Sequence, residues 1–176
     1  MMMNKIDFPK RKNMRLHDVD YSAPGAYFIT ICTQEKQKML SYIVGAIHES
    51  PAMNVKLSEY GEFVERYIQI ARERFDIEIN QYVIMPNHVH LIIEIVPNGA
   101  RAIRESPLRS RSIISQVVGF IKANSSKEIH RTNPDIKIWQ RGFYDHIIRD
   151  ERDYEEISKY ARENPLKWRY DELFCE

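Results

Sequence analysis

The chain has 176 residues, of which 43% are hydrophobic and 29% are charged, and its formal net charge is +1. At roughly 100–200 residues per domain, this length predicts one globular domain. The hydrophobic content and the balanced charge exclude wholesale disorder. Two cysteines are too few for a disulfide framework or a thiolate zinc site, which favours a reducing compartment. The first residues lack the apolar stretch of a signal peptide, and no apolar run approaches the roughly 18 residues of a membrane span, so we expect a soluble, cytoplasmic protein without a membrane partner.

Hydrophobic periodicity divides the chain into an arm and a domain. Residues 1–20 are polar and basic without periodicity, which predicts an extended N-terminal arm, and residues 21–176 form the domain. The last predicted helix ends at Asn164, because Pro165 disfavours a helical conformation in the residue before it. The expected elements, in chain order, are strand 26–33, helix 58–75, strands 77–84 and 89–95, helix 112–130, strand 139–149 and helix 150–164.

The order of these elements favours one fold class. Strands 77–84 and 89–95 are separated by Met85-Pro86-Asn87, which predicts a turn and an antiparallel pair. Mixed strands and helices around such a pair favour an α+β fold over a doubly wound parallel sheet. We expect a ferredoxin-like split β-α-β sandwich, in which helices pack on one face of an antiparallel sheet.

Charge is unevenly distributed along the chain despite its balanced total. Residues 150–176 contain nine acids against five bases, whereas the stretch from Gly99 to Lys127 contains a single acid, Glu105. Clustered Lys and Arg are typical of polyanion-binding surfaces, because phosphate affinity depends on local charge. A solvated loop with ordinary charge variation explains the pattern equally well. The bases of the 99–127 stretch are Arg101, Arg104, Arg109, Arg111, Lys122 and Lys127.

Two histidines stand two residues apart in the strand that follows Asn87. His88 and His90 point to the same face of a strand, because side chains alternate with a period of two. Adjacent imidazoles on an aliphatic strand need a partner, which a metal, a carboxylate or water can supply. A metal dyad and a hydrogen-bonded histidine pair both fit this spacing. A histidine-triad hydrolase does not, because it needs a third histidine where Ile92 stands.

The last predicted helix carries a second candidate pair. Tyr160 and Asn164 are four residues apart and therefore share one helical face. A phenol with an unperturbed pKa of about 10 needs a nearby cation to attack phosphorus. The amide oxygen of Asn164 can ligate a metal without adding charge. Packing of Tyr160 in the core beside Tyr154 and Ile157 is the alternative.

The ordered set of these segments resembles a known family. The segments are RKNMRLHDVDYSAPGAYFITICT (11–33), VIMPNHVHLII (83–93), SIISQVVGFIKANSSKEI (112–129), IWQRGFYDHIIRD (138–150) and YEEISKYARENPLKW (154–168). Together they resemble the single-tyrosine HUH transposases, and most closely the REP-associated tyrosine transposases and related enzymes of short bacterial insertion sequences. The resemblance covers most of the chain in the same order.

The resemblance implies a site and a chemistry. His88, His90 and Asn164 would hold Mg2+ or Mn2+, and Tyr160 would attack the scissile phosphate to leave a 5′-phosphotyrosine and a free 3′-hydroxyl. His146 is expected beside this site, as a supporting or core residue rather than a ligand. The expected partner is single-stranded DNA with a REP-like hairpin. The residues expected to bind it are Arg11, Lys12, Arg15, Arg109, Arg111, Lys122 and Arg141.

Two other functions remain open at the level of the sequence. One is a catalytically silent DNA-binding module of the same fold. The other is a metal-dependent phosphodiesterase that uses water as its nucleophile, with Tyr160 purely structural. The chain is expected to act as a monomer or as a homodimer, and in a homodimer Tyr160 would be able to serve the partner's metal.

Overall fold

The computed structural model describes residues 23–44, 54–75, 77–96 and 112–175. Its central feature is an antiparallel four-stranded sheet with the strand order β4-β5-β1-β6. The sheet strands are β1 (Gly25–Cys32), β4 (Glu78–Ile84), β5 (His88–Ile95) and β6 (Tyr144–Ile148), and the helices are α1 (Glu59–Phe75), α2 (Ile113–Thr132) and α3 (Glu151–Glu163). A separate hairpin, β2 (Ser41–Val44) and β3 (Asn54–Leu57), and two 3-10 turns, η1 (Gln34–Lys36) and η2 (Trp168–Tyr170), complete the described part.

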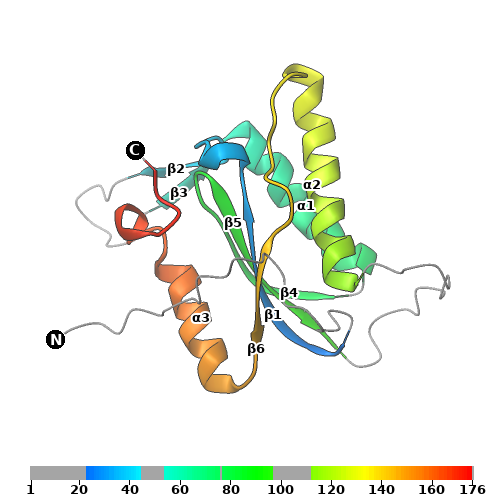
Figure 1. Ribbon diagram of the computed structural model, residues 1–176, viewed down its shortest axis with the longest axis vertical. Helices are drawn as coiled ribbons and strands as arrows, with labels where there is room; N and C mark the ends of the chain where they lie inside the picture. Colours follow the sequence, from blue (N-terminus) through cyan, green and yellow to red (C-terminus); the bar gives the residue numbers. More distant parts are fainter. Residues whose placement is uncertain (1–22, 45–53, 76, 97–111, 176) are drawn as a thin grey trace.

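One face of the sheet is covered by α1 and α2 (Figure 1). Alternate residues of β1 and β5 point to this face, and they form one apolar core with the inner sides of the two helices. Ile29, Leu91, Val64 and Ile121 are among its fully buried members. The burial of this core follows from the period-two pattern of the strands and the helical period of α1 and α2.

The opposite face of the sheet carries α3 (Figure 1). Phe28 and Ile92 point to this face and pack against Ile157 and Ala161 of α3. The expected α+β class with its antiparallel sheet is confirmed. Helices α1 and α2 pack on one face of the sheet, as expected, whereas α3 packs on the other. It does so because this second face also carries apolar side chains, which the amphipathic α3 covers.

The start of the last strand and the end of the last helix differ from their predicted positions for reasons that the structure shows. The strand expected over 139–149 begins only at Tyr144, because Gly142 takes a positive φ of 79° and breaks the extended run. Trp139 pairs with Thr33 as an isolated bridge. The end of α3 is one residue from the predicted position, but Asn164 keeps a helical conformation (φ −54°, ψ −43°) despite the proline that follows.

Some sequence predictions lie outside the described residues. These predictions concern the basic arm 1–20 and the basic residues Arg109 and Arg111, whose placement stays a prediction.

The hairpin of β2 and β3 was not predicted, because its strands have only four residues each. Among the described helices, none is both long and apolar enough to cross a membrane.

Candidate metal and nucleophile site

The two histidines of β5 converge on one point. His88 and His90 lie opposite Cys32 and Thr30 of β1, on the sheet face that α3 covers, and both are buried. Their Nε2 atoms are 3.0 Å apart and their ring centroids 4.5 Å apart. The prediction that both imidazoles share one face is confirmed, because β5 keeps the regular alternation of a strand.

Hydrogen bonds to the outer nitrogens orient both rings. Asn87 donates through Nδ2 to the backbone oxygen of Leu173 at 2.8 Å, so its Oδ1 faces His88 Nδ1, also at 2.8 Å. His88 Nδ1 therefore carries the proton and Nε2 keeps its lone pair. Thr30 Oγ1 lies 2.8 Å from His90 Nδ1 and fixes the orientation of that ring. Such contacts typically fix the orientation of metal-binding imidazoles.

Burial keeps both imidazoles neutral. It lowers the pKa of His88 to about 3, with a smaller contribution from the charge of Lys36. It also lowers the pKa of His90 well below 6.5, and repulsion from His88 adds to the effect. At neutral pH both rings therefore have nitrogen lone pairs available for a cation.

Tyr160 of α3 lies beside His90. The two ring centroids are 5.5 Å apart, and Phe28 fills the space beneath, stacked on His90 at 4.9 Å and edge-on to Tyr160 at 6.2 Å. The phenol donates a hydrogen bond to Asp171 Oδ2 at 3.3 Å. Burial raises the pKa of Tyr160, and the negative charge of Asp171 raises it further, so the hydroxyl is firmly protonated in this arrangement.

Asn164 lies one helical turn beyond Tyr160 and is 2% exposed. Its Nδ2 donates a short hydrogen bond to Asp171, while its Oδ1 is buried and has no hydrogen-bond partner. A buried amide oxygen without a partner is costly, and a cation would satisfy it. The helical conformation of Asn164 is stabilised by this contact and by Lys167 N–H, which donates to the Asn164 carbonyl at 3.1 Å.

Asp171 is a member of the site that our sequence analysis missed. One ligand atom from each of His88, His90 and Asp171 lies within 4.8 Å of the others. Asp171 follows η2 in a stretch without periodicity, so no strand or helix pattern assigns its side chain a direction. The apolar Trp168 and Phe174 around it are the signal that was available, because they indicate a segment that packs back onto the domain.

The donor set fits a divalent cation. The 3.0 Å between the two Nε2 atoms matches the spacing of about 3 Å between neighbouring ligands in an octahedron with metal–ligand distances of about 2.1 Å. Two neutral imidazoles, the free Oδ1 of Asn164 and the Asp171 carboxylate are the available donors. This mixed nitrogen and oxygen set lacks the sulfur ligands that a soft metal prefers.

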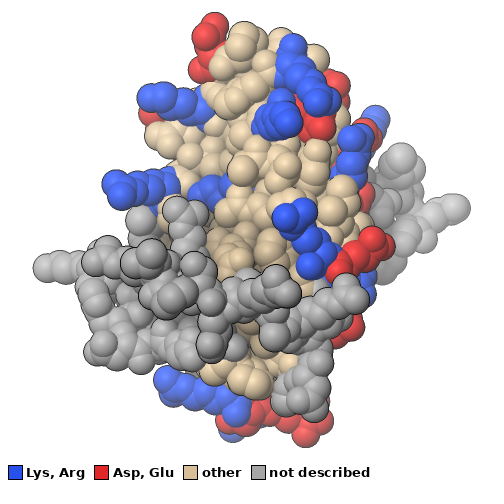
Figure 2. Space-filling view, turned by 90° about the vertical axis from the view of Figure 1, so that its right-hand side faces the viewer, with Lys and Arg blue, Asp and Glu red and all other residues tan. Residues whose placement is uncertain are grey.

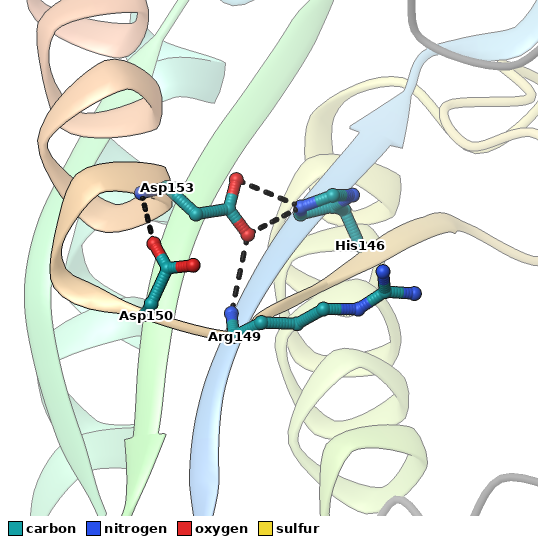
Figure 3. Close-up of polar contacts among 4 residues, drawn as sticks. All are labelled: His146, Arg149, Asp150 and Asp153. Atoms are coloured by element: carbon teal, nitrogen blue, oxygen red, sulfur yellow. Dashed lines mark hydrogen bonds and ion pairs between the residues drawn. The ribbon is translucent and has the colours of Figure 1, made fainter.

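His146 lies in β6 and points toward Asp153 in the first turn of α3 (Figure 3). Its Nε2 is 2.9 Å from Asp153 Oδ2, and the same oxygen accepts the backbone N–H of Arg149 at 3.1 Å. Asp150 caps α3 by accepting the Asp153 N–H at 2.8 Å. These contacts fix the start of the helix that carries Tyr160, so the structure gives His146 a role in positioning α3.

The described members of the expected DNA-binding set differ in their surroundings. The Lys122 ammonium donates to the carbonyls of Gln140 at 2.5 Å and Gly142 at 2.8 Å, and burial lowers its pKa. Arg141, which stands between Gln140 and Gly142 in the sequence, is exposed. On the face shown in Figure 2, the visible Lys and Arg side chains are interspersed with Asp and Glu rather than gathered in one patch.

Three of the four comparisons with known proteins name transposases. The sequence profile described as "Transposase IS200 like" matches residues 54–103. An uncharacterized protein of Haemophilus influenzae is 31% identical and covers 94% of this chain and 94% of its own length. A second protein of that organism, named as a REP-associated tyrosine transposase, is 29% identical over 88% of this chain and 77% of its own. The solved structure of a REP-associated tyrosine transposase bound to a REP hairpin has the same fold, with a TM-score of 0.60 at 19% identity, over 90% of this chain and 76% of that one.

Proposed function

Because this chain belongs to the family of IS200-like, single-tyrosine transposases, we propose that it cleaves and rejoins single-stranded DNA through a covalent bond between Tyr160 and a 5′ phosphate. The observation that carries the proposal is the contact between the nucleophile and the candidate metal ligands. The Tyr160 ring lies 5.5 Å from that of His90, and its hydroxyl is bonded to Asp171.

His88, His90 and Asn164 are proposed to hold Mg2+ or Mn2+. When bound, such a cation polarises the scissile phosphate and stabilises the charge that develops on its oxygens. The neutral state of both imidazoles and the unpartnered Oδ1 of Asn164 support this assignment. Thr30 and Asn87 act as positioning residues, because each fixes the ring of one histidine.

In the proposed reaction the Tyr160 oxygen forms a bond to phosphorus while the bond from phosphorus to the 3′ oxygen breaks. The phenol loses its proton and the departing 3′ oxygen gains one, so the products are a 5′-phosphotyrosine and a 3′-hydroxyl. Attack by a 3′-hydroxyl reverses the step without an external energy source. Tyr160 approaches the histidines of its own chain, which supports action in cis, and a monomer then suffices.

The proposed substrate is single-stranded DNA with a hairpin. The similar structure was solved with a REP hairpin bound, which supports this choice of substrate. Basic residues would bind the phosphates, and the salt dependence of affinity would report their number. The proposed contacts are Arg11, Lys12, Arg15, Arg109, Arg111, Lys122 and Arg141.

The test is a covalent adduct between the full chain and a labelled hairpin oligonucleotide in Mn2+. We expect a labelled band that survives denaturing electrophoresis in the wild type and disappears in Tyr160→Phe. Tyr170→Phe is the matched control, because Tyr170 is 90% exposed and lies near the same segment. Cleavage that persists in Tyr160→Phe would instead identify a phosphodiesterase that uses water, and binding without cleavage in the wild type would identify a silent DNA-binding module.

A further inference from the structure

We infer that Asp171 is a direct ligand of the same cation, so that the C-terminal segment 168–175 forms one wall of the metal site. The inference deepens the proposed function and rests on it for the presence of a cation. It assigns a metal-binding role to a residue that lies beyond the histidine pair and beyond the helix that carries Tyr160 and Asn164.

The segment 168–175 is fixed to the domain by several contacts. Asn87 Nδ2 donates to the Leu173 carbonyl at 2.8 Å, and Lys36 Nζ donates to the Glu172 carbonyl at 3.3 Å. Cys175 Sγ donates to the Lys36 carbonyl at 3.1 Å. The Trp168 ring lies 5.8 Å from the His88 ring. The Asp171 carboxylate is thus delivered to the histidines by folded structure rather than by a free end.

The orientation of the carboxylate is also defined. Its Oδ1 accepts the Leu173 N–H at 2.6 Å, and its Oδ2 accepts hydrogen bonds from Asn164 Nδ2 and from the Tyr160 hydroxyl. The Tyr160 ring packs in turn against His90, so these contacts keep the carboxylate beside the histidines. One ligand atom of Asp171 accordingly lies within 4.8 Å of those of both histidines.

The Asp171 carboxylate has no ion-pair partner in the part of the chain that the structure describes, since no Lys or Arg there lies within ion-pair distance of it. The groups that donate hydrogen bonds to its Oδ2 are a phenol and an amide, which carry no formal charge. A partly buried carboxylate whose hydrogen-bond partners are neutral is stabilised by a cation. Mg2+ and Mn2+ prefer anionic oxygen ligands, and Asp171 supplies the negatively charged oxygen that the neutral donors lack.

The test measures Mn2+ affinity of the full chain without DNA, by isothermal titration calorimetry and by electron paramagnetic resonance of free Mn2+. We expect Asp171→Asn to weaken binding at least about tenfold, the lower end of what is lost even when a group that only supports a ligand is removed. Glu172→Gln is the matched control: it removes one negative charge at the next position, and we expect an affinity within about twofold of the wild type, as for an exposed charge. His88→Ala should abolish binding. Equal affinities of Asp171→Asn and Glu172→Gln, with His88→Ala inactive in binding, would overturn the inference.

A second measurement keeps the inference testable if Asp171→Asn does not fold. In the wild type, saturating Mn2+ should slow amide hydrogen exchange in residues 168–175, because a ligand from this segment becomes fixed to the cation. Unchanged exchange at saturation would contradict Asp171 ligation. The adduct assay separates the two proposals, because Asp171-dependent Mn2+ binding without any Tyr160 adduct would refute the proposed function and leave the ligand assignment intact.

Discussion

His90 Nδ1 lies 2.8 Å from Thr30 Oγ1 on the neighbouring strand, and both groups are buried. The hydroxyl fixes the ring so that its Nε2 meets that of His88. This relationship between β1 and β5 follows from their register, in which Thr30 is directly opposite His90. The orientation of the candidate metal ligand His90 therefore depends on a residue of a different strand.

Thr30→Val tests this support. The variant keeps the shape of the side chain and removes the hydroxyl, so we expect Mn2+ affinity to fall by about 10- to 100-fold, the usual effect of losing a group that orients a ligand. Thr30→Ser retains the hydroxyl and should bind nearly as the wild type does. Calorimetric titration of both variants with Mn2+ measures the two affinities. If both variants bind Mn2+ equally weakly, the loss comes from altered packing and not from the missing hydroxyl.

Asn87→Ala should destabilise the apo protein and weaken cation binding together. The change leaves His88 Nδ1 and the Leu173 carbonyl without their partners, and a buried polar group left unpaired costs about 1–3 kcal/mol. Urea unfolding in the presence of a chelator measures the first effect and Mn2+ titration the second. Unfolding free energy equal to that of the wild type would show that water replaces the amide at no cost.

Acid should unfold the metal-free protein partly through its histidines. Burial lowers the pKa of His88 to about 3 in the folded state, from 6.5 in the unfolded chain, so the unfolded state binds more protons between these values. The stability that the neutral ring contributes is complete above pH 6.5 and is lost as the pH falls toward 3, at about 1.4 kcal/mol per pH unit for each proton taken up on unfolding.

The measurement is urea unfolding of the chelated protein from pH 7 to pH 4, compared with His88→Gln. Glutamine does not titrate, so the variant should lose less free energy over this range than the wild type does. Parallel pH profiles would show that carboxylates alone cause the acid sensitivity.

Two glycines in helices should respond to alanine in opposite ways. A Cβ at Gly61 in α1 would lie 2.0 Å from the Leu40 carbonyl oxygen, a backbone atom that cannot move aside. We expect Gly61→Ala to cost about 1–3 kcal/mol of unfolding free energy. At Gly119 in α2 nothing lies within 4 Å of the added Cβ, so Gly119→Ala should stabilise the protein by about 0.5–1 kcal/mol. Thermal unfolding of the pair provides the comparison, and a stable Gly61→Ala would show that the contact with Leu40 relaxes.

Local periodicity predicts which candidate residues share a face, and the family resemblance assigned these residues to one site. The strand period of two places His88 and His90 on one face, and the helical period places Tyr160 and Asn164 one turn apart. Both patterns need only residues within one element. The sequence therefore determined the histidine pair, the tyrosine helix, the antiparallel strand pair and the α+β class, because each depends on short-range alternation of side chains.

The tertiary structure decided which of these elements meet and what joins them. Asp171 reaches the histidines through a return of the chain that no periodic pattern marks. Asn87 and Lys36, from distant segments, hold this return by donating to the carbonyls of the neighbouring Leu173 and Glu172. The side of the sheet that α3 covers likewise depends on Phe28 and Ile92, against which Ile157 and Ala161 of α3 pack. Such contacts join residues far apart in the chain, and the free energy that selects them comes from burial and hydrogen bonding in the folded domain rather than from the local conformation of any one segment.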